Sequence, residues 1–175
     1  MNVWRYLLLF GWMLVFGPIA AQEQPPFLLT DIGTSGCSVY FPGMIPEPVL
    51  SYAEDSSKVY VMELHTDFWG PYTFGLILVD IASGDLNGEE LPALQGYLGF
   101  MRQSYGIVDQ QGEVAQNNNG MADIQDFWFD SNNNYWSVRA FAKKDKVAVL
   151  FIIGPEVFPY EGVEKVFFDN FAFPE

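Results

Sequence analysis

Along most of the chain, hydrophobic residues either alternate with polar ones or form short apolar runs, which is a pattern typical of β-strands. Residues 58–65 (KVYVMELH) and 72–81 (YTFGLILVDI) are predicted to be strands. The second of them is apolar on both faces, which predicts a central place in its sheet. Gly70-Pro71 between them predicts a hairpin connection. Residues 39–41 begin another strand, which the prolines that follow confine to a sheet edge or end.

The period changes between residues 83 and 106, where apolar side chains recur every three or four positions. This spacing predicts the main helix. Its apolar stripe is Leu91, Leu94, Leu98, Met101 and Tyr105. Asp85 or Asn87 is expected to cap the start of the helix, and Gly106 to end it.

The second half of the chain predicts antiparallel strands at residues 107–115, 121–129, 135–142 and 147–153, joined by polar turns. Helical spacing over residues 163–171 then predicts a closing helix that buries phenylalanine side chains. This order indicates an α+β fold. We expect a mostly antiparallel sheet packed against a long central helix and a C-terminal helix.

The N-terminal residues 1–21 have the pattern of a secretory signal peptide. Arg5 supplies the positive charge, residues 6–16 are an uncharged apolar stretch, and Ala21 is the preferred cleavage position. The alternative, a membrane anchor, is disfavoured because the apolar stretch is shorter than the roughly 20 residues that span a bilayer. We therefore expect export to the periplasm or the medium, with no membrane insertion after cleavage.

The remaining chain is divided into a tether at residues 22–36 and a single α+β domain at residues 37–175. Twenty-two acidic residues against eight basic ones give a net charge of −14, which disfavours nucleic acid as a partner and favours a solubilising surface. Cys37 is the only cysteine, so no disulfide can form within one chain. We expect a monomer in which Cys37 is a small buried residue; a reactive thiol or an intermolecular disulfide is the alternative.

The sequence shows no catalytic residue set, no metal-binding motif and no cofactor motif. His65 is the only histidine, and no serine lies in a G-x-S-x-G pattern. The acidic pairs Asp123 with Asp126 and Glu89 with Glu90 leave acid–base hydrolysis open as an alternative.

A short oxygen-rich run resembles the start of a calcium loop. It consists of Asp130, Asn132 and Asn134 at alternate positions. The pattern then fails, because Tyr135 stands where a calcium loop needs glycine and Phe141 where it needs glutamate.

The candidate binding residues lie together in the predicted hairpin, where aromatic side chains often contact partners or sugars. They are His65, Asp67, Phe68 and Trp69. A core position is the alternative for the two aromatic residues. Trp128 and Trp136 lie within predicted strands and are expected to be core residues or a cross-strand pair.

Several of these segments together resemble the PsbP-like α-β-α sandwich family. The resemblance covers about residues 37–174 and rests on Phe41-Pro42-x-x-Ile45-Pro46, the two strands at 58–65 and 72–81, the helix, and Phe167-Phe168-x-x-Phe171. It implies an accessory or binding role without catalysis. We therefore expect an exported non-enzymatic protein that binds a protein or a small molecule. A carboxylate- or cation-dependent hydrolase and a structural cell-envelope component remain alternatives.

Overall fold

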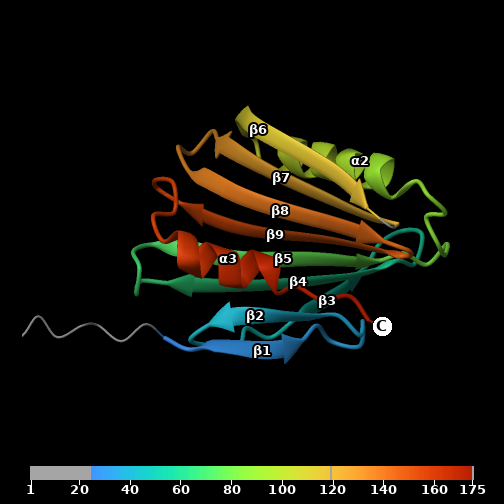
Figure 1. Ribbon diagram of the computed structural model, residues 1–175, viewed down its shortest axis with the longest axis horizontal. Helices are drawn as coiled ribbons and strands as arrows, with labels where there is room; N and C mark the ends of the chain where they lie inside the picture. Colours follow the sequence, from blue (N-terminus) through green and yellow to red (C-terminus); the bar gives the residue numbers. More distant parts are fainter. Residues whose placement is uncertain (1–24, 119, 175) are drawn as a thin grey trace, which may run out of the picture.

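A seven-stranded antiparallel sheet forms the centre of the computed structural model, which describes residues 25–118 and 120–174 (Figure 1). The predicted signal peptide at residues 1–21 lies outside the described residues. The strand order in the sheet is β3-β4-β5-β9-β8-β7-β6. These strands are β3 (Val49–Tyr52), β4 (Lys58–Thr66), β5 (Tyr72–Asp80), β6 (Ile107–Asn118), β7 (Met121–Asp130), β8 (Tyr135–Lys143) and β9 (Lys146–Gly154).

The sheet confirms the strand predictions, since β4 and β5 form an antiparallel hairpin and β5 lies in the interior between β4 and β9. The four strands β6 to β9 pair consecutively and antiparallel, as their polar turns predicted. The short edge strand β3 was not predicted as a strand. All four of its residues are exposed, so it carries no alternation of buried and exposed positions.

The predicted tether is wrong over its second part. Residues 27–31 form β1 (Phe27–Asp31), which pairs antiparallel with β2 (Ser38–Pro42) in a separate two-stranded sheet. The turn between β1 and β2 packs on the core. Ile32 is fully buried, and the Thr34 hydroxyl lies 3.0 Å from the Tyr60 hydroxyl. A side chain on Gly33 would collide with the Tyr60 ring, so the turn requires glycine at this point.

Two helices pack on opposite faces of the seven-stranded sheet. Figure 1 shows α3 (Glu161–Asp169) in front of β9 and β5, and α2 (Glu90–Ser104) behind β6 and β7. The expectation of a long central helix is wrong: α2 has 15 residues and covers one end of one face, while the sheet is central. We call the two sides of the sheet the α2 face and the α3 face.

The start of α2 also differs from the prediction. Asp85 accepts a hydrogen bond from the Asn87 amide at 2.9 Å, and Asn87 and Gly88 both have positive φ angles of 53° and 92°. This left-handed turn cannot continue into a helix. The helix therefore begins only at Glu90, and neither Asp85 nor Asn87 caps it.

Each face of the sheet has its own hydrophobic core. On the α2 face, Leu94, Leu98 and Met101 pack against the sheet as their helical spacing predicted. On the α3 face, Phe167 and Phe168 pack together with residues of β1 and β2, including Phe41. Within the described residues, no helix is both long enough and apolar enough to cross a membrane.

Candidate functional site

The predicted binding hairpin between β4 and β5 divides into a buried part and an exposed part. Trp69 is only 8 % exposed, and its ring packs against Phe74 and Phe158 at centroid distances of 5.8 and 6.3 Å. Phe68 is half-buried with its ring edge-on to Trp69 at 5.0 Å. The two aromatic residues therefore belong to the core of the α3 face, and Trp69 is not the exposed contact residue that its place in a hairpin suggested.

His65 and Asp67 are the exposed half of that hairpin. The Nδ1 atom of His65 lies 2.7 Å from the Thr73 hydroxyl on the neighbouring strand. Together with Asp67 and Pro71 they line a shallow recess of about 180 Å³. The structure thus keeps His65 and Asp67 together as a polar surface, without the aromatic partners that were expected beside them.

The acidic pair Asp123 and Asp126 is separated by the sheet itself. Residues three apart on a strand point to opposite faces. Asp123 lies on the α3 face and accepts two hydrogen bonds from Arg139. Asp126 lies buried on the α2 face with the indole of Trp128. The two carboxyl groups therefore cannot act on one substrate bond.

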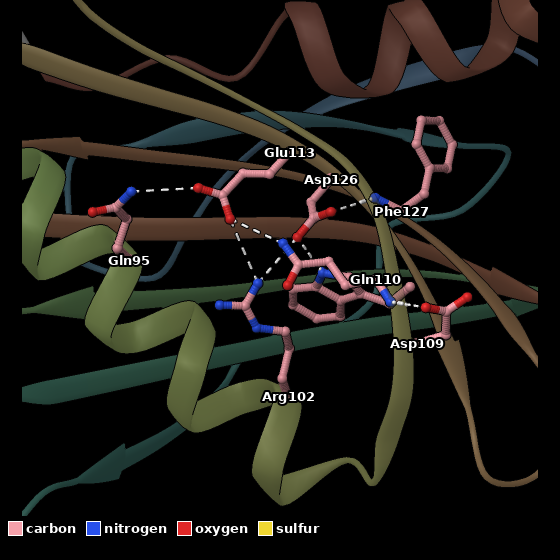
Figure 2. Close-up of polar contacts among 8 residues, drawn as sticks. Gln95, Arg102, Asp109, Gln110, Glu113, Asp126 and Phe127 are labelled. Atoms are coloured by element: carbon pink, nitrogen blue, oxygen red, sulfur yellow. Dashed lines mark hydrogen bonds and ion pairs between the residues drawn. The ribbon is translucent and has the colours of Figure 1, made fainter.

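Asp126 is the centre of a polar network between α2 and the sheet (Figure 2). Arg102 extends from α2 and places Nη1 3.2 Å from Asp126 and 3.6 Å from Glu113 of β6. Burial raises the pKa of the Asp126 carboxyl, although hydrogen bonds from the Trp128 indole and the Phe127 amide favour its charged form. Each member has a protein partner, so the network joins α2 to the sheet.

The calcium-like run forms a tight turn between β7 and β8. Burial alone raises the pKa of Asp130, but hydrogen bonds from the Asn134 amide, the Trp136 indole and the Asn134 side chain reverse this and lower it. The Asp130 oxygens thus serve the protein's own N–H groups. Among the described residues, no three histidine, cysteine, aspartate or glutamate side chains gather closely enough to hold a metal ion.

Cys37 is fully buried on the α3 face, as expected for a small core residue. Burial raises the pKa of the thiol, and the nearby Ser35 hydroxyl lowers it by less, so the pKa is about 11. A thiol with such a pKa is almost entirely protonated at neutral pH and is a poor nucleophile.

A different region of the α3 face presents aromatic residues to solvent. The strand register aligns two rows of side chains across the sheet. In one row Asp109, Phe129 and Tyr135 are neighbours on β6, β7 and β8. In the other row Phe127 of β7 pairs with Ser137 of β8. The rings of Phe129 and Tyr135 lie 5.0 Å apart. Neighbouring side chains on one face of a sheet make a continuous surface, so these rows form the floor of a groove.

We call this region the aromatic groove. Its volume is about 190 Å³, and its lining includes Asp109, Gln111, Phe127, Phe129, Tyr135 and Val157. Phe127 is 45 % exposed and Tyr135 is 41 % exposed, so neither ring is covered by α3. Asp109 is its only charged lining residue. The arrangement can enclose a small apolar group and leave one carboxylate beside it.

The alternation of residues 126–129 is a sequence signal for this groove. Phe127 and Phe129 alternate with Asp126 and Trp128, so a strand there must carry aromatic side chains on both faces. The expected cross-strand pair is confirmed for Trp128 and Trp136, which are buried partners 6.0 Å apart on the α2 face. Phe127 and Phe129 then necessarily lie on the other face.

The fold and the groove together define an α+β domain, built on a seven-stranded antiparallel sheet, with an exposed aromatic depression on one face. In sequence comparisons the chain matches no protein-family model and no curated protein.

Proposed function

We propose that this protein is an exported, non-catalytic binding or accessory protein, and that the aromatic groove is its binding site. The observation that carries the proposal is the exposure of Phe127 and Tyr135 side by side with Phe129 in one hollow of the sheet. Exposing large aromatic rings costs free energy in an unbound protein, and concave apolar surfaces with a few polar groups are typical of ligand sites.

The resemblance to the PsbP-like family supports the same class of function. Two helices on opposite faces of an antiparallel sheet are consistent with an α-β-α sandwich. That family resemblance implies accessory and binding roles rather than catalysis. The signal-peptide pattern of residues 1–21 adds export to the proposal.

The groove replaces the β4–β5 hairpin as the main candidate site. His65 and Asp67 remain a polar surface there, but the burial of Trp69 removes the large apolar contact that motivated the hairpin. The hydrolase alternative loses its best acid pair, because Asp123 and Asp126 lie on opposite faces and each has its own arginine partner.

A neutral apolar fluorescent probe, N-phenyl-1-naphthylamine, tests the groove directly. We expect saturable binding to the purified protein, with about tenfold weaker affinity in Phe127→Ala, equivalent to about 1.4 kcal/mol. The matched control is Phe100→Ala, which removes a 61 % exposed phenyl ring from α2, outside the groove. Equal binding by wild type and Phe127→Ala, or equal losses in both variants, would refute the groove as the binding site.

Export has a separate test. Protein recovered from outside the cytoplasm of its own host should begin at Gln22, as N-terminal sequencing would show. Recovery only from the cytoplasm with Met1 retained would contradict export and would leave the groove proposal unaffected.

A further inference from the structure

The single carboxylate of the aromatic groove has no cationic partner. Asp109 accepts hydrogen bonds from the Gln110 amide at 2.9 Å and from the Gln111 side-chain amide at 3.0 Å. Both donors are neutral. Within the described parts of the chain, the ion pairs formed by arginine and lysine involve other acids. The negative charge of Asp109 is therefore uncompensated at the mouth of the groove.

The three rings on the α3 face of the groove, Phe127, Phe129 and Tyr135, likewise have no protein cation from the described residues over them. Over the described residues, the cation–ring contacts pair Arg102 with Trp128, Arg139 with Phe141 and Lys143 with Phe173. None of these involves the groove rings of Phe127, Phe129 or Tyr135. The exposed surfaces of Phe127 and Tyr135 are thus not engaged by a protein cation from the described part of the chain.

From these two observations we infer that the groove binds a small organic cation of the quaternary ammonium class. This inference rests on the proposed function. Aromatic rings attract such cations through their negative faces, and cages of several rings recognise methylated ammonium groups. Asp109 supplies the counter-charge beside Phe129, its cross-strand neighbour. The net charge of −14 favours the approach of a cation over that of an anion to the protein as a whole.

The size of the groove agrees with this class of ligand. Its volume of about 190 Å³ is below the roughly 300–1,000 Å³ of pockets for drug-sized molecules, and an apolar cavity of about 150 Å³ is large enough for benzene. A metal cation does not fit the same surface, because calcium takes about six to eight oxygen ligands and the groove is lined mainly by apolar rings.

Choline and 3,3-dimethylbutan-1-ol test the inference, because the second molecule has the shape of the first without its charge. Isothermal titration of the purified protein at low ionic strength measures both affinities. We expect choline to bind about tenfold more tightly than the neutral alcohol. Asp109→Asn should weaken choline binding about fivefold or more and leave the alcohol unchanged.

Two further variants separate the groove from the general charge of the protein. Asp85→Asn makes the same charge change in the exposed turn before α2 and should leave both affinities at the wild-type values. Phe129→Leu keeps an apolar side chain but removes the ring, so it should weaken choline binding by about threefold to tenfold and change the alcohol little.

The outcomes distinguish this inference from the proposal on which it rests. Equal affinity for choline and the alcohol, with no effect of Asp109→Asn, would overturn the organic cation and leave an apolar binding groove. Absence of choline binding, with the naphthylamine probe still bound, would also overturn the organic cation and leave an apolar binding groove. Absence of binding by all three compounds would overturn both proposals.

Discussion

Trp128 and Trp136 are cross-strand neighbours on β7 and β8, and each donates its indole N–H to a different buried aspartate. Trp128 Nε1 lies 2.6 Å from Asp126 Oδ2, and Trp136 Nε1 lies 3.0 Å from Asp130 Oδ2. The two rings are 6.0 Å apart on the α2 face. Asp126, which the sequence offered as a candidate for hydrolysis, and Asp130, which it offered for calcium binding, are therefore hydrogen-bond acceptors of the core.

Removing the carboxylate of Asp126 should destabilise the protein strongly. Asp126→Ala leaves the Trp128 indole without its acceptor and Arg102 with only Glu113, and leaving a buried donor unsatisfied costs about 1–3 kcal/mol. Urea unfolding measures the loss. Asp123→Ala, on the same strand but with a side chain that is 21 % exposed, is the matched control and should cost no more than about 1 kcal/mol. Similar costs for both variants would contradict the structural role assigned to Asp126.

Asp126 and Asp130, the two acceptors of the tryptophan indoles, should affect the pH dependence of stability with opposite signs. The pKa of Asp130 is lowered in the folded state, so its stabilising contribution is present above its ordinary value of 3.8 and is lost as the pH falls through the lowered pKa. The pKa of Asp126 is raised, so its protonation favours the folded state as the pH falls from above that raised pKa towards 3.8.

Unfolding of Asp130→Asn and Asp126→Asn as a function of pH tests these signs. The stability deficit of Asp130→Asn relative to wild type should shrink on acidification. The stability of wild type relative to Asp126→Asn should rise as the pH falls from above the raised pKa of Asp126 towards 3.8. Parallel pH profiles for wild type and both variants would show that neither carboxyl group titrates differently on folding.

Trp69 should behave as a core residue. Trp69→Ala removes a ring that packs against Phe74 and Phe158, and such truncations cost about 3–5 kcal/mol. Trp69→Phe keeps an aromatic ring and removes an indole N–H that has no hydrogen-bond partner, so it should cost much less. Thermal unfolding compares the two. A stable Trp69→Ala protein with altered ligand binding would restore Trp69 as a contact residue.

Cys37 should be inert towards thiol reagents in the folded protein. It is fully buried and its pKa is raised to about 11, so little thiolate is present and none is accessible. Reaction with Ellman's reagent should proceed only after unfolding in urea. Stoichiometric reaction of the native protein at the rate of a free thiol would show that this part of the core opens.

The raised pKa of Cys37 also has a consequence for stability at high pH. The unfolded chain ionises near the ordinary thiol value of 9.0, whereas the folded protein ionises only near 11. Stability should therefore fall as the pH rises between these values. Cys37→Ala, which cannot ionise, should lose less stability over the same range, as unfolding curves at increasing pH would measure.

Much of the fold was predictable because its strands carry strong local signals. The apolar run of β5 and the polar turns between β6 and β9 placed these strands close to their observed bounds. The strands β1 and β3 could not be predicted in this way, because a short strand at a sheet margin is defined by its partner rather than by its own pattern. The start of α2 was misplaced because the positive φ angles of Asn87 and Gly88 depend on the turn they form.

The candidate site depended on information that no local pattern contains. Bulges in β6 shift its pairing with β7 between Gln111 and Val114, and also between Ile107 and Asp109. Each shift changes which residues face each other, so Asp109 could not be aligned with Phe129 from strand predictions alone. The two alternatives for Trp69, contact residue or core residue, could not be decided from the sequence for a related reason, since Phe158, which packs on Trp69, is distant in sequence.

Hydrophobic periodicity, acidic composition and the lone cysteine were sufficient to establish an α+β chain with an antiparallel sheet and no internal disulfide, because these properties act locally or by simple count. Register, layer order and burial depend on contacts between distant segments, and only the folded arrangement contains them. Those contacts bury Trp69 and Cys37, and leave Phe127 and Tyr135 exposed beside Asp109.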